Sequence, residues 1–171
     1  MSLSRVCVLV AAVTVLIGSP VELLAQAARD LHAEIDLRAS AIAGDVIAWR
    51  RDLHQNPELG NREFRTAGVV AEHLRSLGFD EVRTDVAHTG VVGVLRGGRP
   101  GPVVGLRADM DALPVTELAD VPFASRVTTE YNGQQVGVMH ACGHDVHTAA
   151  LMGTASVLAG IREVLAGTVV F

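Results

Sequence analysis

Two different spacings of apolar residues alternate along this chain, and this alternation restricts its fold more than any other feature. Between residues 31 and 53, apolar side chains recur at steps of three, four and seven residues, which predicts an amphipathic helix that ends before Pro57. Residues 63–77 repeat this spacing, and Gly78 is the expected end of the second helix. The same spacing returns between residues 147 and 165 and predicts a third helix.

Short valine-rich segments lie between these helices and predict β-strands at residues 81–86, 91–95 and 103–107. The sequence GGRPG separates the last two segments, so we expect a tight turn and a hairpin there. The segment TTEYNGQQ is expected to be a loop. Gly167 predicts a turn before residues 169–171, which we interpret as the start of another strand, too short to complete a pairing.

Helices interleaved with apolar strands predict an α/β domain in which layered helices surround a mixed sheet. The length of 171 residues, with 49% hydrophobic and 19% charged residues, is enough for one globular domain with a sizeable core. The formal net charge is −5 and the basic residues are scattered. Nucleic acid is therefore not an expected partner.

The first 27 residues have the features of an export signal. A short positive start is followed by the uncharged run VCVLVAAVTVLIG, and Ala25-Gln26-Ala27 matches the small-x-small pattern of a signal peptidase site. The run is shorter than the roughly 20 residues that span a bilayer, so an uncleaved anchor is the weaker alternative. We expect a signal peptide at residues 1–27, a mature domain at residues 28–171, and a periplasmic or extracellular location without a membrane span.

Cleavage at this position would leave Cys142 as the single cysteine, because Cys7 lies in the apolar run. An intrachain disulfide is then impossible. A lone thiol in an oxidising compartment is exposed to oxidation unless it is buried or bound. Metal coordination is one way to hold it as a protected thiolate, and a buried structural thiol is the alternative.

The segment MHACGHDVH holds three of the seven histidines of the chain, together with Cys142. It is expected on a loop between a strand and a helix, where ligand sites of α/β sheets collect. Cys142 and His144 are two residues apart, so in extended backbone they would point the same way, and Gly143 between them can adopt a positive φ. Thiolate and imidazole suit Zn²⁺, or less selectively Mn²⁺, Co²⁺ or Ni²⁺, but two ligands do not complete a site.

Four further side chains are candidates for supporting groups of such a site. Asp109 and Asp111 follow a predicted strand at the same two-residue spacing, and could bind a cation or orient a ligating histidine. Alternatively, one caps a turn and the other is solvated. Asp145 and His147 follow His144 directly, and Asp145 could instead be the N-cap of the next helix.

Three segments resemble the M20 metallopeptidase family, specifically its branch of hippurate hydrolases and indole-acetyl-amino-acid hydrolases. They are RRDLHQNPELGNREFRTA, GLRADMDALPVTE and MHACGHDVHTAALMGTASVL, and the resemblance covers residues 46–171. It implies the first part of an M20-type catalytic domain, with Cys142 and His144 as metal ligands and Asp109 and Asp111 as supporting groups. It also implies two divalent ions (manganese, zinc or nickel) and hydrolysis of N-acyl amino acids or peptide-like amides.

The sequence lacks several residues and a domain that this family has. The adjacent glutamates that supply the general base and a ligand would follow beyond Phe171, as would two further histidines and the inserted dimerisation domain. No catalytic residue is therefore assigned within the chain, and Glu117, Glu130 and Glu163 do not occupy the matching position. A homodimer is expected only for a full-length form.

Other functional classes have less support. The chain has no H-E-x-x-H, no deaminase signature and no G-x-S-x-G, and a redox protein would need a second cysteine. The main alternative to a metal-dependent amidohydrolase is a non-catalytic truncated fragment or metal-binding remnant.

Overall fold

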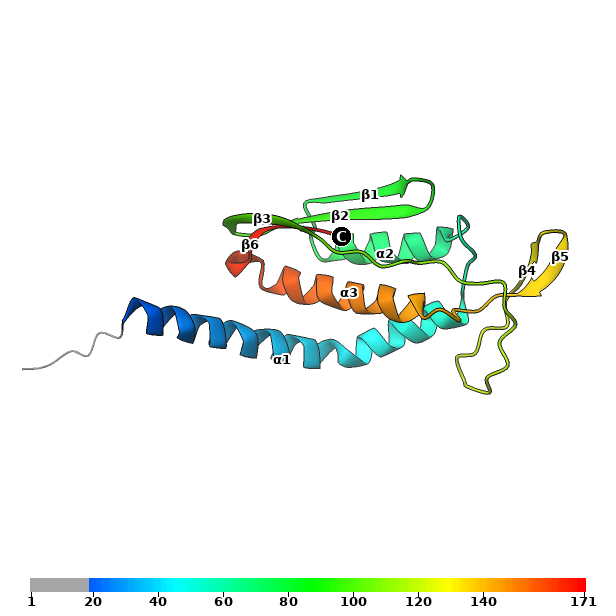
Figure 1. Cartoon of the computed structure of the whole chain (residues 1–171), viewed down its shortest axis with the longest axis horizontal. Coiled ribbons are helices and arrows are strands. Elements are labelled where there is room, and N and C mark those ends of the chain that lie inside the picture. Colours follow the sequence, from blue (N-terminus) through cyan, green and yellow to red (C-terminus); the bar gives the residue numbers. More distant parts are fainter. Residues whose placement is uncertain (1–18) are drawn as a thin grey trace, which may run out of the picture. The chain divides into compact units, whose positions relative to one another are not determined.

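The structure is a computed structural model and describes residues 19–171 (Figure 1). The chain divides into two compact units, Met1–Glu34 and Ile35–Phe171. Of the first unit, the structure describes residues 19–34, which are helical from Pro20 onward. The sheets, helices α2 and α3 and the candidate site belong to the second unit.

The three predicted helices are confirmed. Helix α1 spans Pro20–Gln55, α2 spans Phe64–Ser76 and α3 spans His144–Gly160, followed by a 3₁₀ turn at Arg162–Val164. Gly78 has a φ of 72° and lies directly after the C-cap of α2, as expected for a helix terminator. Helix α3 begins three residues earlier than its apolar spacing indicated, because its first turn carries the polar residues of the CGHDVH segment.

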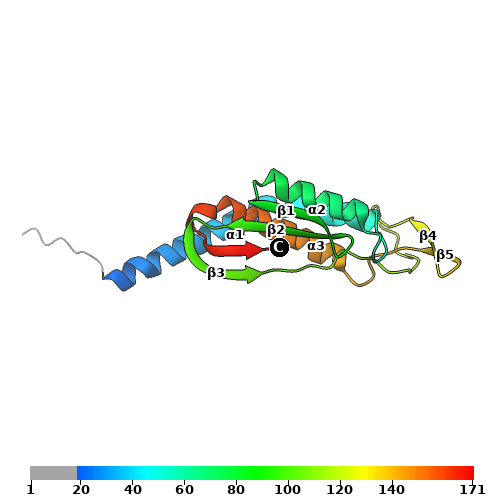
Figure 2. The same cartoon turned by 90° about the horizontal axis from the view of Figure 1, so that it is seen from above.

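Four strands form a mixed sheet in the order β1-β2-β6-β3. Strand β1 spans Glu81–Val86, β2 spans Gly90–Arg96, β3 spans Arg99–Gly105 and β6 spans Ala166–Val170. Strand β6 pairs antiparallel with β2 and parallel with β3, and Figure 2 shows it in red between them. The expectation that the last strand is too short to pair is wrong, because Thr168, Val169 and Val170 pair with β2 on one side and with β3 on the other.

The predicted hairpin between β2 and β3 is also wrong, because β6 lies between these strands. The glycines of the connection serve a close approach to β6 instead. The amide of Gly97 donates to the carbonyl of Gly167 at 2.8 Å, and a Cβ at Gly97 would lie 2.2 Å from the carbonyl oxygen of Leu165. A side chain there would therefore force the connection away from the strand.

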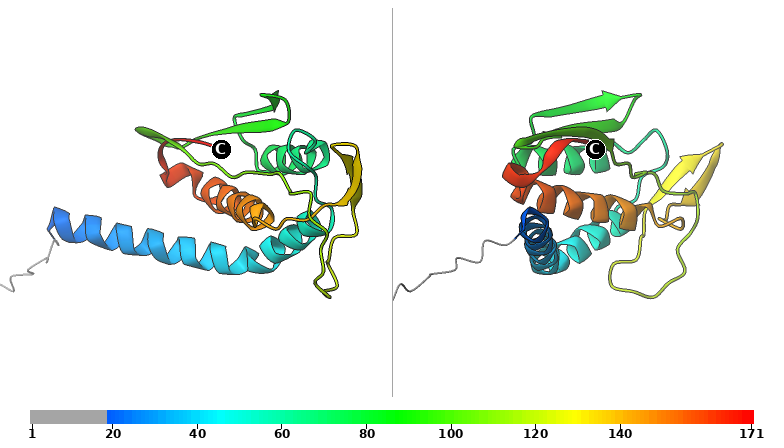
Figure 3. Two further views of the ribbon diagram at one scale, coloured as in Figure 1. Left: turned by 45° about the vertical axis from the view of Figure 1, so that its right-hand side comes forward. Right: turned by 60° about the vertical axis from the view of Figure 1, so that its left-hand side comes forward.

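The segment expected to be a loop forms a separate two-stranded hairpin. Strand β4 spans Thr128–Tyr131 and β5 spans Gln134–Gly137, and they pair antiparallel. Asn132 and Gly133 connect them with φ values of 52° and 75°, as a type I′ turn requires. Figure 3 shows this hairpin in yellow, apart from the four-stranded sheet.

The core of the second unit lies between the sheet and the helices. Figure 1 shows α2 and α3 on one face of the sheet. Leu74 of α2 approaches β2 at Gly93, where a Cβ would lie 2.7 Å from its Cδ1. Gly153 similarly admits Val46 of α1 against α3. The largest apolar side chains that are less than 2% exposed are Leu53 and Leu95. The α/β prediction of helices layered on a mixed sheet is confirmed.

The predicted signal peptide falls mainly outside the described residues. Its apolar run, residues 6–18, is not described, whereas residues 25–27 lie within α1. Among the described helices, none is long and apolar enough to cross a membrane. Export and cleavage after Ala27 remain predictions.

Candidate metal centre

The CGH segment forms a tight turn at the start of α3. Cys142 lies in the turn and is exposed with a free thiol, and Gly143 caps the helix with a φ of 85°. The extended backbone expected between Cys142 and His144 is therefore wrong, whereas the positive φ at Gly143 is confirmed. Amides of residues 146 and 147 donate to the Gly143 carbonyl at 3.0 and 3.2 Å and fix this first turn.

His144 is held by Asp111. Its Nδ1 lies 2.9 Å from the carbonyl oxygen and 3.0 Å from the Oδ1 of Asp111. A carboxylate and a carbonyl only accept hydrogen bonds, so Nδ1 carries the proton and Nε2 is left with a lone pair in the neutral ring. Histidines that bind metals show this arrangement, in which the other ring nitrogen donates to a carboxylate or carbonyl.

Asp109 does not take the same role as Asp111. Its carboxylate forms an ion pair with Arg107, and its backbone carbonyl accepts a hydrogen bond from Thr148 at 2.9 Å. Asp109 therefore fixes the loop against α3 through its backbone. His147 is exposed, and its ring centroid lies 5.9 Å from that of His144.

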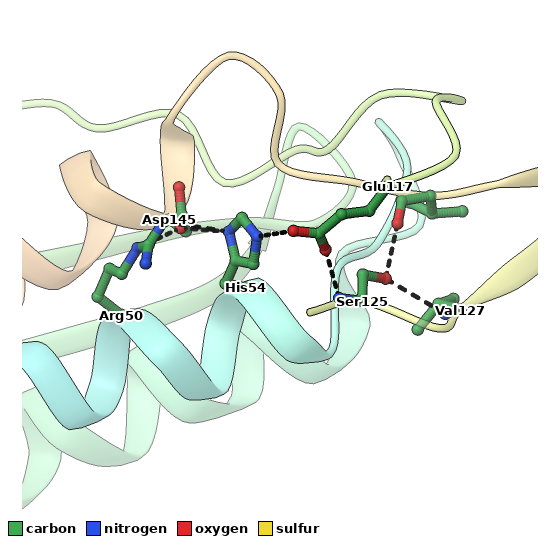
Figure 4. A network of polar contacts seen from close by, with 7 residues as sticks. Arg50, His54, Glu117, Ser125, Val127 and Asp145 are labelled. Atoms are coloured by element: carbon green, nitrogen blue, oxygen red, sulfur yellow. Dashed lines mark hydrogen bonds and ion pairs between the residues drawn. The ribbon is translucent and has the colours of Figure 1, made fainter. Parts of the chain in front are cut away.

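Asp145 is buried, and it is not the N-cap of α3, which is Gly143. It is 1% exposed, and its Oδ2 lies 2.8 Å from both Nδ1 of His54 and Nε of Arg50. The Nε2 of His54 lies 3.1 Å from Oε1 of Glu117, whose other oxygen accepts the Ser125 amide. Figure 4 shows this network, which joins α1, the loop that contains Glu117 and α3.

The pKa of Glu117 is lowered by this network. Burial acts to raise it, but hydrogen bonds from His54 and the Ser125 amide, with the charges of His54 and Arg126, bring the pKa below its ordinary value. Both oxygens of this carboxylate are thus engaged, and it is not free to accept a proton from a reacting group.

His140 lies beside this network. It is 5% exposed, and neither ring nitrogen has a hydrogen-bond partner within the described residues. Burial lowers the pKa of the ring, against the opposing charge of Asp145, and the neutral form is therefore favoured.

The two candidate donors are of the type that a borderline-soft metal ion prefers, but they are too few to complete its coordination. The thiol of Cys142 and Nε2 of His144 match its preferred ligands. Across residues 19–171, however, no three side chains of histidine, cysteine, aspartate or glutamate come together in a way that could hold an ion. A pocket of about 780 Å³ is bordered by Asp109 and Asp111 but by neither donor. The described residues therefore offer two candidate donors, fewer than such an ion requires.

Sequence reasoning missed Arg50, His54 and the structural role of Glu117. His54 and Arg50 lie one helical turn apart on α1, which is a signal that both face the same neighbour. Their partners are 63 and 91 residues away from His54, and spacing along the chain does not reveal such contacts.

The comparisons with known proteins agree with the fold and with the segments around the centre. Residues 105–171 match peptidase family M20/M25/M40. Thermostable carboxypeptidase 2 of Saccharolobus solfataricus is 47% identical over 140 residues, 82% of this chain and 34% of that protein. The N-acyl-L-amino acid amidohydrolase of Geobacillus stearothermophilus is 45% identical over 138 residues, 81% of this chain and 35% of that protein.

A solved structure shows the same fold. The Bacillus subtilis YXEP protein, described as a dinuclear metal binding peptidase from the M20 family, superposes with a TM-score of 0.68 at 41% identity and covers 77% of this chain and 35% of its own. The chain thus spans about a third of the length of these relatives. Together with the fold and the helix-start CGH segment, these similarities show that residues 105–171 carry part of a domain of peptidase family M20/M25/M40.

Proposed function

We propose that this chain is part of a metal-dependent amidohydrolase that cleaves the amide bond of N-acyl amino acids or peptide-like substrates. The observation that carries the proposal is the hydrogen bonding of His144, whose Nδ1 is occupied by Asp111 and whose Nε2 remains for a metal. The similarity to an N-acyl-L-amino acid amidohydrolase and to a carboxypeptidase supports the substrate class.

Cys142 and His144 would hold one or both of two divalent cations, in line with the dinuclear centre of the YXEP protein. Such a cation polarises the amide carbonyl and lowers the pKa of water. Within this chain, Asp111 orients His144, and the turn at Gly143 places the thiol next to the helix start. The general base would come from outside these residues, because Glu117 is already bonded on both oxygens.

A chimeric enzyme tests the proposal directly. The matching third of the Geobacillus stearothermophilus amidohydrolase is replaced by residues 35–171 of this chain, and release of amino acid from N-acyl amino acids is followed with added Mn²⁺ or Zn²⁺. Turnover that is lost in the Cys142→Ser chimera supports the proposal, because a hydroxyl replaces a thiolate at nearly constant volume. Turnover that is unchanged by this substitution contradicts the assigned ligand.

A further inference from the structure

His54 occupies an unusual position between two buried carboxylates. Its Nδ1 lies 2.8 Å from Oδ2 of Asp145, and its Nε2 lies 3.1 Å from Oε1 of Glu117. The three residues are 4%, 1% and 6% exposed, so water does not compete for these contacts. Figure 4 shows the ring held between the two acids.

The protonation state of the ring follows from its partners. Ionised carboxylates only accept hydrogen bonds, and a neutral imidazole donates from one nitrogen alone. Only the doubly protonated ring donates to both acids. The lowered pKa of Glu117 agrees with an ionised carboxylate on that side. On the other side, Nε of Arg50 lies 2.8 Å from Oδ2 of Asp145, and Nη2 of Arg50 lies 3.4 Å from Nδ1 of His54, so Asp145 is the acceptor shared by both side chains. With both acids ionised, this hydrogen bonding requires two cations, His54 and Arg50, beside two anions.

Phe123 covers the network from the side of the loop. The guanidinium groups of Arg50 and Arg51 each lie 5.0 Å from its ring centroid, and the His54 ring meets it edge-on at 5.7 Å. The loop that supplies Glu117 is thus attached to α1 by the contact of Glu117 with His54 and by the contacts of Phe123 with Arg50, Arg51 and His54.

Asp145 connects this network to the candidate metal centre. It follows His144 directly and lies in the first turn of α3, where Asp111 holds the His144 ring. A buried anchor at Asp145 fixes the rotation of this turn, and that rotation sets the direction of Nε2 of His144 and of the adjacent Cys142 thiol.

We infer that His54 is a positioning residue, a charged bridge between Glu117 and Asp145 that holds the start of α3 and so orients the metal donors Cys142 and His144. This role rests on the proposed function for its effect on metal binding. The position of the start of α3 does not depend on that function, so the positioning role and the metal assignment can be tested separately.

The first measurement is the protonation of His54 in the 171-residue chain. Long-range ¹H–¹⁵N spectra distinguish a doubly protonated imidazole from either neutral tautomer. We expect the doubly protonated pattern for His54 at neutral pH, assigned by its loss in the His54→Gln variant. A neutral tautomer at this position would overturn the inference.

The second measurement is metal affinity in chains that carry Cys7→Ser, so that the thiolate-to-metal absorption with Cd²⁺ as the probe reports Cys142 alone. His54→Gln should weaken Cd²⁺ binding about tenfold, as is typical when a supporting partner of a ligand is lost. The matched control is His73→Gln, since His73 also bridges to α3, through the Met152 carbonyl at 3.0 Å and Ser156 at 3.1 Å, but lies outside the network. Equal affinities in the two variants would overturn the inference.

Folding and the proposed function are controlled separately. If His54→Gln does not fold, the double variant His54→Gln with Glu117→Gln removes one cation and one anion together, and should fold while still binding Cd²⁺ weakly. If the unaltered chain shows no thiolate absorption, the metal assignment fails by itself. In that case, shifted backbone amide signals of residues 143–147 in His54→Gln support the positioning role, and unshifted signals refute it.

Discussion

Two aspartates of the same loop illustrate how single residues acquire different roles. Asp109 and Asp111 are two residues apart, and the sequence offered the same alternatives for both. In the structure the Asp111 carboxylate lies 3.0 Å from Nδ1 of His144, whereas the Asp109 carboxylate pairs with Arg107. Both side chains are partly exposed, at 35% and 41%. The two carboxylates therefore differ in their partners, since only Asp111 contacts a histidine.

This difference predicts the effect of removing each charge. Asp111→Asn should weaken metal binding roughly 10- to 100-fold, because it loses the charged acceptor that fixes the ligating histidine. Asp109→Asn should leave affinity almost unchanged, since its backbone carbonyl still accepts from Thr148. Calorimetric titration of both variants with Zn²⁺ measures the effect, and similar losses in both would contradict the assigned roles.

The lowered pKa of Glu117 predicts a dependence of stability on pH. A carboxyl whose pKa is lower in the folded state binds fewer protons there than in the unfolded chain. Its contribution is fully present above the ordinary glutamate pKa and is lost as pH falls through the folded pKa. Between about pH 7 and about pH 3 the free energy of unfolding should therefore decrease.

The Glu117→Gln variant should show a smaller decrease over this range. Glu130→Gln is the matched control, because Glu130 is exposed on the β4–β5 hairpin. Urea denaturation at several pH values measures the slopes, and equal slopes for the Glu117 variant and the unaltered chain would refute the prediction.

At the scale of elements, the glycines show how one residue type serves different needs. Gly143 has a φ of 85° at the start of α3, in the left-handed region that other L-residues rarely adopt. Gly44 lies on the exposed side of α1, in the middle of a regular helix. A Cβ would meet no atom within 4 Å at either position, so only backbone conformation distinguishes them.

Alanine substitutions at these two glycines should therefore have opposite effects. Gly143→Ala should lower the free energy of unfolding by about 1–2 kcal/mol, the cost of a left-handed alanine. Gly44→Ala should raise it by about 0.5–1 kcal/mol, because alanine loses less entropy in a helix. Urea denaturation without metal measures both changes, and a stabilised Gly143→Ala variant would show that the turn is not needed.

At the scale of the whole molecule, the donor set predicts how the isolated chain behaves. Within residues 19–171 no three potential ligands come together, and both oxygens of the Glu117 carboxylate are engaged. The 171-residue chain should therefore show no release of amino acid from hippurate above the background with excess Mn²⁺ or Zn²⁺ alone. Loss of a general base by itself commonly costs about 10²- to 10⁴-fold in rate. Multiple turnovers that disappear in the Cys142→Ser variant would contradict this expectation.

A second prediction at this scale concerns the N-terminus. We propose that the chain is exported and that its mature form begins at Ala28, because Ala25-Gln26-Ala27 follows an uncharged apolar run. Intact-mass analysis of protein recovered from an exporting host decides the point. A mass that includes residues 1–27 would contradict it, and Ala27→Arg should block the cleavage as a control.

The sequence alone was sufficient to predict those elements whose structure depends on interactions between residues close together in the chain. The spacing of apolar residues along residues 31–53 and 63–77 predicted α1 and α2, because a helical face has a fixed period. Gly78 was predicted as a helix end since only glycine adopts its φ without strain. The location of Cys142 before a helix also followed from the local pattern, whereas His144, expected on the preceding loop, is the first residue of α3.

Contacts between distant segments were decided only by the tertiary structure. The segment GGRPG at residues 97–101 predicted a hairpin turn. Its glycines instead lie against β6, some 70 residues later in the chain, and no local sequence signal predicts that contact. Asn132-Gly133 is a hairpin signal, but the polar residues around it favour a loop in the sequence, and only the structure shows the pairing of β4 with β5. The partners of His54 illustrate the same limit: α1, the Glu117 loop and α3 form a buried charge network only after the chain has folded, since ion pairs depend on distance in space.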